Sequence, residues 1–465
     1  MGARLKATIL RWKAKCAEST KEKQKAKAAL VKARQRIKKL EQENEALRAR
    51  LAPQGVAYHT YPAQMIAMAV FMVVHAGSSL RCASKTLGFL SQMLGWSYGS
   101  PSHSTIRNWV LRCGLYCLEY GTEKTGKYVG IIDESIQIGR EKLLLLLGVK
   151  LPEDRSHAAP LMMSDVEVLG MEVQQSWTGE DVAEFIEKRM ERHKGIELLY
   201  MIADQGTALK SGLCKLGIAL VGDCSHVMMN IVKRLFETDG PLAELCAQIG
   251  GLRRKLLLTE HGHLLPPTLR DKDRFMRIFT VVEWSDRIMK HWEKLSESVR
   301  PKLNFLVQAQ GVIADMRQVK ELVALTAKLL KSAGLSSVSH QKWEARIDQF
   351  TQENALNPKA EVFIQTLRRY FTSHENLMNQ YGRLLCSSDI IESTFGKYKN
   401  KGGVKVISAD VLSIALYGQE ITPAFIQIAL SNTHNKDLEQ WAQRFTCDNR
   451  FSILRRMDRD MKSAA

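Results

Sequence analysis

The first pattern along the chain is a seven-residue repeat of apolar positions between residues 20 and 52. The repeat places Leu30, Ile37, Asn44 and Leu51 at its a positions and Ala33, Leu40 and Leu47 at its d positions. Such a seam is typical of a two-stranded coiled coil, and one polar Asn at an a position favours a fixed register and a dimer. We therefore predict that residues 20–52 pair with a second copy of the chain. A lone helix packed on its own chain is the alternative.

Helical periodicity returns after Pro53 and Gly55, with apolar helices expected at 62–75 and 80–94. In a third helix, at about 103–117, the apolar residues recur on one face, and Arg107, Asn108 and Arg112 lie mostly away from it. This order resembles a helix-turn-helix domain whose third helix contacts DNA through those three residues. The connector of roughly eight residues exceeds the usual three or four, so a plain helical bundle remains the alternative.

The period changes to that of β-strands beyond residue 126. Three successive strands are expected in YVGIIDESIQI, KLLLLLGVKL and VEVLGMEVQQSW, followed by an amphipathic helix at 181–194. A fourth strand in ELLYMIADQG and a short one in IALVGDCSH follow, and a further helix comes at 226–236. With one more helix between the fourth and fifth strands, the predicted order is β-β-β-α-β-α-β-α. From about 240 to 380 the pattern is helical throughout, and a helical tail closes the chain.

Charge narrows the choice of partner. The net charge is +18, and residues 1–50 alone carry 16 Lys and Arg against five Glu. Such a field favours nucleic acid or an anionic membrane surface; a solvated basic tail is the alternative. No apolar run of 18 residues and no signal peptide is visible, and the nine cysteines include no CxxC pair. We therefore expect a nucleic-acid partner, no membrane, and a reducing cytoplasm.

Three acids that are far apart in the sequence suggest a metal-dependent catalytic site. Asp133 and Asp204 each follow an apolar strand, and Glu392 lies in the first turn of a basic helix, in DIIESTFGKYK. One well-known sheet arrangement makes the first and fourth strands neighbours, and a helix packed on the sheet could add Glu392. Carboxylates without His or Cys ligands suit Mg²⁺ or Mn²⁺, two of which can act on a phosphodiester. Alternatively Glu392 caps its helix with Asp389, and Glu134 and Asp389 are the nearest substitutes as ligands.

These motifs in this order resemble the DDE transposase superfamily. The resemblance covers roughly residues 126–238 and 384–402, and it implies a ribonuclease-H-like core in which Asp133, Asp204 and Glu392 are catalytic and hold two metal ions. Asp223 and His226, in GDCSHVMMN, match the C/DxxH signature of the hAT-type and Mutator-like groups, which implies an auxiliary role. Lys397 and Lys399 follow Glu392 and either contact DNA phosphates or merely solvate the helix.

The expected fold is an α/β ribonuclease-H-like core with a large all-α insertion, preceded by a coiled coil and a helix-turn-helix-like DNA-binding domain. The expected segments are 1–52 (basic arm and dimerisation helix), 53–125 (DNA binding), 126–238 (first part of the core), 239–383 (helical insertion) and 384–465 (last part of the core and a helical tail).

The expected function is that of a transposase of the bacterial insertion-sequence type, located in the cytoplasm with the nucleoid. It would bind double-stranded DNA, both the ends of a mobile element and the target, as a homodimer or larger assembly. With Mg²⁺ it would cleave a strand and transfer it. A hydrolytic nuclease of the same fold, and a transposase-derived DNA-binding regulator without catalysis, are the alternatives.

Overall fold

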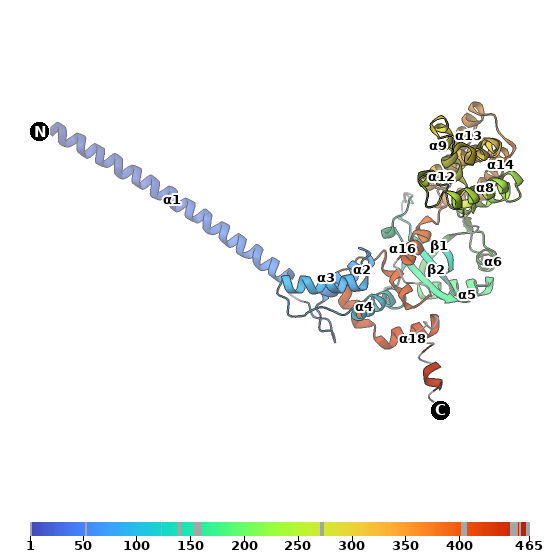
Figure 1. The fold of residues 1–465 in the computed structure, drawn as a ribbon. Coiled ribbons are helices and arrows are strands. Elements are labelled where there is room, and N and C mark those ends of the chain that lie inside the picture. The colour runs from blue at the N-terminus through green and yellow to red at the C-terminus, as the bar shows by residue number, and fades with distance from the viewer. Residues whose placement is uncertain are drawn as a thin grey trace.

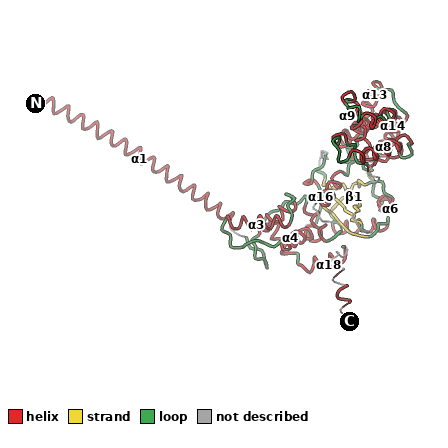
Figure 2. The backbone as a smooth tube through the Cα atoms, viewed as in Figure 1, coloured by secondary structure: helices red, strands yellow, loops and turns green. Residues whose placement is uncertain are grey.

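The computed structural model describes residues 2–51, 54–121, 123–136, 141–152, 160–269, 274–400, 407–446, 454 and 457–461. Figure 1 shows three parts, which are a single long helix, a central body that contains a β-sheet, and a helical lobe above it. Figure 2 shows that the strands of the described chain are confined to the central body. The architecture is therefore mixed α/β with helices predominating.

The N-terminal part is one continuous helix, α1 (Gly2–Leu51). It begins well before the predicted start at residue 20, because the basic arm is also rich in the helix-formers Ala, Lys, Glu and Arg. At 1.5 Å per residue it is roughly 75 Å long, and it projects away from the body (Figure 1). Its seam residues Leu30, Ile37 and Leu40 are about half exposed, at 52%, 55% and 47%. Pairing of this seam with a second copy remains a prediction.

The sheet has five strands in the order β3-β2-β1-β4-β5. They are β1 (Thr125–Ile136), β2 (Lys142–Lys150), β3 (Glu167–Gln174), β4 (Gly195–Ala203) and β5 (Leu220–Gly222). β1 pairs antiparallel with β2 and parallel with β4, while β2–β3 is antiparallel and β4–β5 parallel. The predicted order of strands and helices is confirmed, and so is the predicted adjacency of the first and fourth strands.

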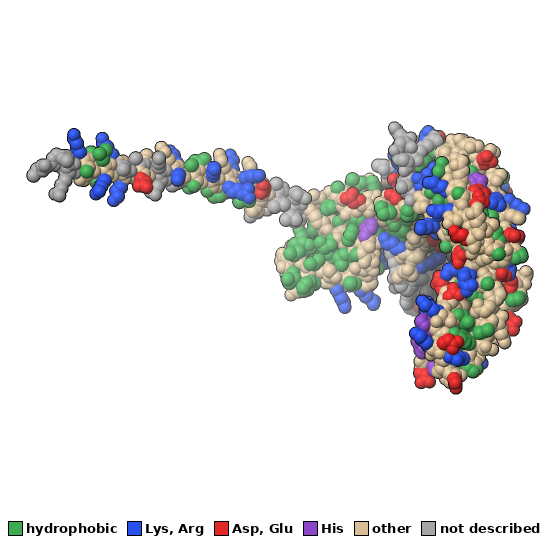
Figure 3. Space-filling model, turned by 90° about the horizontal axis from the view of Figure 1, so that it is seen from above, with side chains coloured by type: hydrophobic (Ala, Val, Ile, Leu, Met, Phe, Trp, Pro, Cys, Tyr) green, Lys and Arg blue, Asp and Glu red, His purple; other side chains and the backbone are tan. Residues whose placement is uncertain are grey.

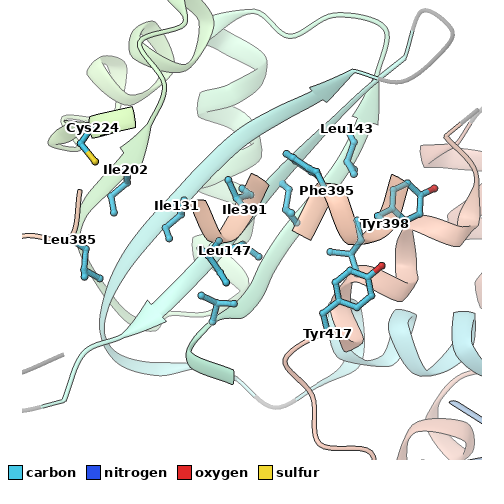
Figure 4. Packing of buried hydrophobic residues seen from close by; sticks show 14 of the residues in the cluster. Ile131, Leu143, Leu147, Ile202, Cys224, Leu385, Ile391, Phe395, Tyr398 and Tyr417 are labelled. Atoms are coloured by element: carbon cyan, nitrogen blue, oxygen red, sulfur yellow. The ribbon is translucent and has the colours of Figure 1, made fainter. Parts of the chain in front are cut away.

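Helices cover both faces of the sheet because its strands are apolar on both sides. On one face, Ile132, Leu144 and Leu146 pack against α5 (Gly179–Arg192) and α6 (Thr207–Lys215). The other face carries Ile131, Leu147 and Ile202, on which α7 (Cys224–Phe236) and α16 (Asp389–Lys399) pack. Figure 4 shows Ile391 and Phe395 of α16 directed at this second face.

The helical lobe is inserted between α7 and α16. Its larger helices are α8 (Gly240–Leu256), α9 (Arg274–Lys290), α12 (Gln310–Ala333), α13 (Ser337–Glu353) and α14 (Pro358–Ser373), with shorter α10 (Arg300–Leu303), α11 (Phe305–Gln308) and α15 (Glu375–Tyr381). Within the described parts of 240–380 no strand occurs, as the sequence predicted; a single β-bridge joins Leu335 to Leu384 as the chain returns. Trp284 is buried there and donates its indole N–H to the Leu264 carbonyl (3.1 Å), which suits a core residue.

The remaining helices form one block on the other side of the sheet domain. It contains α2 (Ala63–Val74), α3 (Leu80–Met93), α4 (His103–Leu115) and the short π-helical turn η1 (Tyr116–Tyr120). The C-terminal η6 (Ala409–Leu416), α17 (Pro423–Asn432) and α18 (Asn435–Phe445) pack against α4. Helices η6, α17 and α18 therefore complete this block, a contact between distant segments that the sequence pattern could not indicate. Residues 457–461, beyond α18, are also helical.

One face of this block is apolar and exposed. Figure 3 shows hydrophobic side chains gathered over the part that adjoins the end of α1. The exposed large hydrophobic residues of α2 and α3 are Met68, Phe71, Phe89 and Met93. Among the helices of the described chain, none is both long enough and apolar enough to cross a membrane.

Candidate active site

Asp133 and Asp204 lie on neighbouring strands and on one face of the sheet. In the parallel β1–β4 ladder, Ile131 pairs with Ile202, and each aspartate follows its isoleucine by two positions. Because side chains alternate along a strand, residues two apart share a face. Both carboxylates therefore lie on the face that α16 covers.

The sequence placed Asp133 where the apolar part of its strand gives way to polar residues, within a strand expected at 128–138. β1 does continue past Asp133, to Ile136, because residues 134–136 pair with 142–144 of β2 in an antiparallel ladder. Asp133 consequently lies inside the sheet and is only 8% exposed. Its Oδ1 accepts the backbone N–H of Glu134 (2.8 Å). Asp204 directly follows β4, as predicted.

A glycine that the sequence analysis passed over shapes the Asp204 turn. The Gly206 N–H donates to Asp204 Oδ1 (2.9 Å). A Cβ at this position would lie 2.8 Å from the same oxygen, so a larger residue would displace the carboxylate. The Asp-x-Gly spacing, typical of a turn closed by an aspartate side chain, was the available signal.

Glu392 projects from α16 into solvent. Ile391 and Phe395 anchor the helix on the sheet, which leaves Glu392 on the exposed side. α16 begins after Ser388, and no side chain caps it. The carboxylate of Asp389 instead lies 2.6 Å from Lys331 Nζ and accepts a weak hydrogen bond from Ser225 (3.3 Å). The alternative in which Glu392 and Asp389 cap the helix is therefore not supported.

The three acids influence one another electrostatically. Burial, followed by the negative charges of Asp204 and Glu392, raises the pKa of Asp133 to about 7; a hydrogen bond from Glu134 and the charge of His226 act in the opposite direction. A carboxyl group responds in this way when it is desolvated next to like charges. The fold thus places Asp204 and Glu392 near enough to Asp133 for their charges to act on it.

Asp133, Asp204 and Glu392 lack a basic partner, whereas each of the two acids that could replace them as metal ligands has one. Glu134 lies 2.9 Å from Lys142 Nζ, and Asp389 lies 2.6 Å from Lys331 Nζ. Among the described residues no Lys or Arg forms an ion pair with Asp133, Asp204 or Glu392. Since Glu134 and Asp389 are already neutralised, the negative charge that needs a cation belongs to the other three acids.

Asp223 ties the sheet to the helix that carries Glu392. It is the N-cap of α7, where its Oδ2 accepts the His226 backbone N–H (2.8 Å), while its Oδ1 accepts the N–H of Ser388 (2.8 Å). The Cys224 N–H donates to the carbonyl of Cys386 alongside (2.8 Å). Burial raises the pKa of Asp223, but hydrogen bonds from the His226 side chain and from the Ser388 and His226 N–H groups outweigh burial and hold it below the usual value. One buried carboxylate therefore fixes the start of α16 against β5 and α7.

His226 places a positive charge beside the acids. Its Nδ1 lies 2.8 Å from Asp223 Oδ2, and this hydrogen bond, opposed by burial and helped by the charges of Asp223, Asp133 and Asp204, raises the pKa of His226 to about 9. The imidazole is therefore protonated at neutral pH and donates to Asp223. Its side chain is 38% exposed, so it also faces solvent.

The donor set fits a hard divalent cation by its chemistry. Asp133, Asp204 and Glu392 supply oxygen ligands only, which Mg²⁺ and Mn²⁺ prefer. As the side chains are placed, no three Asp, Glu, His or Cys residues of the described chain converge into a metal-binding group. Glu392 is the exposed member, and a long exposed side chain can change its rotamer.

The predicted DNA contacts of α4 divide into two accessible residues and one buried residue. Arg112 is 7% exposed and donates to the carbonyls of Leu430 and Thr433. It therefore holds the C-terminal helices to α4, and its assignment as a DNA contact is not supported. Arg107 pairs with Asp410 (2.8 Å), and Asn108 donates to Asn435 (2.8 Å); both are partly exposed.

The exposed start of α4 borders a groove of about 980 Å³. Ser104, Thr105 and Asn108 line one side, and His434 and Lys436 at the start of α18 line the other. Only the first turns of α4 are accessible, because the rest is enclosed by η6, α17 and α18. A DNA contact by α4 would therefore use its N-terminal end.

The two lysines after Glu392 differ in their surroundings. Lys397 Nζ lies 4.3 Å from the centre of the Tyr417 ring, and burial lowers its pKa. Lys399 lies 5.7 Å from the Phe395 ring centre and is exposed. Lys399 is thus free to meet a phosphate, whereas Lys397 is partly occupied with packing.

No protein-family model matches the chain, and a search of curated proteins finds no match. The site itself combines three carboxylates that have no Lys or Arg partner among the described residues with a protonated histidine.

Proposed function

We propose that this chain is a DDE-type transposase with a ribonuclease-H-like core, which cleaves and joins DNA strands at the ends of a mobile element. One observation carries the proposal. The charges of Asp204, after β4, and Glu392, on α16, act on Asp133 of β1 and raise its pKa, and no described Lys or Arg forms an ion pair with any of the three acids. Support also comes from the strand order β3-β2-β1-β4-β5 with β1 antiparallel to β2 and parallel to β4.

Asp133, Asp204 and Glu392 are the residues that would hold Mg²⁺ or Mn²⁺. Bound ions of this kind activate the attacking oxygen and stabilise the leaving oxygen at a phosphodiester. Asp223 keeps α16, and with it Glu392, in place over the sheet. Protonated His226 offers a positive charge to a DNA phosphate near the acids.

The basic surface of α1 is suited to DNA. Figure 3 shows Lys and Arg side chains distributed along this helix, and such charge provides the sequence-independent part of DNA affinity. In the proposed enzyme, α1 also pairs two subunits through its heptad seam. Each of two element ends would then meet its own active site.

The test compares wild-type protein with Asp133→Asn on plasmid DNA that carries the sequences flanking the coding region, in Mg²⁺. Loss of a ligand costs several kcal/mol of transition-state stabilisation, and each 1.4 kcal/mol is tenfold in rate, so strand cleavage should fall at least about a thousandfold. Glu134→Gln, next in the same strand, should keep activity near that of the wild type. Near-normal cleavage by Asp133→Asn would refute the proposal.

The products separate the proposal from its alternatives. Joined strands indicate transposition, and nicks without joining indicate a hydrolytic nuclease. Because no metal-binding group of three side chains is formed among the described residues as placed, a DNA-binding regulator with inert acids is the second candidate. That protein would bind the same DNA and leave it uncut.

A further inference from the structure

The long helix α1 is unbroken from Gly2 to Leu51, so the heptad register of its second half continues into its first half. A register is shifted only where residues are inserted or the helix is interrupted. The predicted seam began at residue 20, and residues 1–19 were expected to be a basic arm. Counting back by sevens from the predicted seam gives the a positions Lys23, Cys16 and Ile9 and the d positions Ala26, Ser19 and Trp12.

The first half of α1 therefore has apolar residues of its own on the seam. Ile9 is 49% exposed and Trp12 is 71% exposed, so both lie in water on a single helix, as Leu30 does in the second half. Figure 3 shows hydrophobic side chains among the Lys and Arg side chains of this helix. Ile9 and Leu30 are three heptads apart, so one partner helix can cover both. Burial of such side chains is favourable in proportion to their apolar area.

The charged residues beside the seam indicate which partner fits and how it is oriented. When two copies of a helix run parallel and in register, each g residue faces the e residue of the partner's next heptad. Three such pairs are of opposite charge, namely Glu22–Lys27, Arg36–Glu41 and Glu43–Arg48. Each of the other three pairs within residues 2–51 contains an uncharged residue; they are Thr8–Lys13, Lys15–Thr20 and Ala29–Arg34. A second copy of α1 is thus complementary in charge to the first.

An antiparallel pair is less well matched, because it sets e positions against e positions. Five of the seven e residues are basic, namely Lys6, Lys13, Lys27, Arg34 and Arg48. Like charges across such an interface oppose pairing. The charges therefore favour the parallel arrangement.

We propose that α1 pairs along its whole length with α1 of a second copy, parallel and in register, and that Ile9 and Trp12 form the N-terminal half of this interface. The proposal rests on the pairing through the heptad seam proposed above and extends it by about three heptads. Lys23 at an a position, like Asn44, specifies the register at some cost in stability. The c positions lie away from the seam and include basic residues, so charge remains available for DNA; these residues are Arg11, Lys25, Lys32 and Lys39.

Cys16 tests the orientation and the register together in the full-length protein. Diamide takes up the two thiol hydrogens as an S–S bond forms, and non-reducing electrophoresis measures the covalent dimer. A disulfide requires Cα atoms within about 7 Å, a distance that residues directly opposed across the seam satisfy. In an antiparallel pair of full overlap the two Cys16 residues would be roughly 30 Å apart, and a shift of one heptad would separate them by roughly 10 Å.

We expect a covalent dimer of the wild-type protein in the absence of DNA and none of Cys16→Ser, in which the other cysteines are unchanged. A protein that sediments as a dimer but forms no such cross-link would overturn the parallel, in-register arrangement of the N-terminal half. An equal amount of cross-linked dimer in Cys16→Ser would overturn it as well, because other cysteines would then be responsible. A cross-link that formed only after duplex DNA was added would mean that DNA, and not the second copy, is the partner of this face.

Two matched lysine substitutions test the apolar contact itself. Trp12→Lys places a charge on the seam one turn from Cys16, whereas Leu10→Lys places the same charge off the seam, at a side chain that is similarly exposed (66%). Trp12→Lys should slow formation of the cross-link at least about tenfold, because two repelling charges replace a buried apolar contact. Leu10→Lys should change the rate less than about twofold, since a b position does not meet the partner. Equal rates in the two variants would overturn the N-terminal interface.

Failure of this proposal is separate from failure of the proposals on which it builds. A dimer without the Cys16 cross-link removes the N-terminal interface and leaves the pairing of the second half, whereas a monomeric protein removes both. Strand cleavage without the cross-link leaves the transposase assignment intact, and the cross-link without strand cleavage removes that assignment alone.

Discussion

At the scale of single residues, the candidate site keeps an acid where an acid is unfavourable. Asp133 is 8% exposed and lies beside two other carboxylates. A desolvated charge without a cation lowers stability, and groups with such perturbed pKa values concentrate at functional sites. Nearby Glu134, by contrast, is satisfied by Lys142. The cost of burying the Asp133 charge can be measured as a change in the melting temperature when this residue is replaced.

Asp133→Asn should make the metal-free protein more stable at alkaline pH. The pKa of Asp133 in the folded state, about 7, lies above the ordinary 3.8, so the folded state holds the proton more tightly. The contribution of Asp133 to the free energy of unfolding is therefore largest below about pH 4 and is lost as the pH rises through about 7. A pKa difference of about 3 corresponds to roughly 4 kcal/mol. In the presence of a metal chelator, the melting temperature of Asp133→Asn should therefore be higher than that of the wild type at pH 8 and equal to it at pH 4.

Asp286→Asn is the control for this measurement, because Asp286 pairs with Arg317 in the lobe (2.5 Å) and carries no burial penalty of this kind. It should show no gain at pH 8. If Asp133→Asn melted below the wild type at pH 8, burial of that charge would not be the destabilising feature inferred here.

Asp223→Ala should lower both stability and cleavage. The change leaves the N–H groups of His226 and Ser388 without their acceptor, which costs about 1–3 kcal/mol for each buried group. It also releases the start of α16, so Glu392 loses its position. Asp239→Ala is the matched control, because Asp239 caps α8 (2.9 Å) in the lobe. It should lower stability alone, measured by denaturant unfolding beside the cleavage assay.

Equal loss of cleavage in the two variants would mean that Asp223 acts only through global stability. The pKa of His226 in the Asp223→Ala variant provides a second test. Without Asp223 it should fall from about 9 towards or below its ordinary value, since that hydrogen bond is the main cause of the increase. Chemical-shift titration of the imidazole can follow this fall.

At the scale of helices, α4 is the centre of its block. It contacts α2, α3, α17 and η6, and its close approach to η6 depends on Gly114. A Cβ at Gly114 would lie 2.1 Å from the Leu412 carbonyl oxygen, so no side chain fits there without movement of the backbone.

Gly114→Ala should therefore destabilise the protein although alanine is the better helix former. Overpacking of this kind costs about 1–3 kcal/mol, which exceeds the roughly 1 kcal/mol that alanine contributes in a helix. Gly250→Ala in α8 has open space around it and should be stabilising. Chemical denaturation of both variants compares the two effects; a more stable Gly114→Ala protein would contradict the observed packing.

At the scale of the whole molecule, α1 is a long helix whose described apolar seam residues, Leu30, Ile37 and Leu40, are about half exposed. Ile37 is 55% exposed on it. A lone amphipathic helix gains most of its stability by packing, and the seam repeats every seven residues, as in two-stranded coiled coils. Pairing with a second α1 would bury it.

Ile37→Lys should therefore shift the full-length protein from dimer to monomer in sedimentation experiments. A charge at an a position opposes pairing. Gln35→Lys, which adds the same charge two positions away and off the seam, should leave the dimer intact. A wild-type protein that remains monomeric at hundreds of micromolar would remove the coiled coil, and α1 would then be a basic helix for DNA alone.

Features of the fold that depend on local periodicity could be predicted from the sequence, and features that depend on contacts between distant residues could not. Apolar periodicity located the strands, because burial on both faces leaves nearly continuous aliphatic runs such as 142–149. It also located Asp204 at a strand end. It placed Asp133 where the apolar part of its strand gives way to polar residues, whereas pairing with β2 keeps this residue inside the sheet. It also assigned Arg112 to the surface, because a helical pattern cannot indicate that distant carbonyls will accept its hydrogen bonds.

The sequence by itself determined which residues are available for chemistry: the three acids, the Asp223–His226 pair, the basic α1 and the order of strands and helices, all encoded by local periodicity and residue type. The tertiary structure alone decided which acids are neutralised, because Lys142 and Lys331 reach their partners through the fold. It also decided that Asp223 holds α16, and that the C-terminal helices enclose α4. Several of those outcomes depend on contacts between residues more than three hundred positions apart, such as Arg107 with Asp410, 303 apart, and no local pattern specifies them.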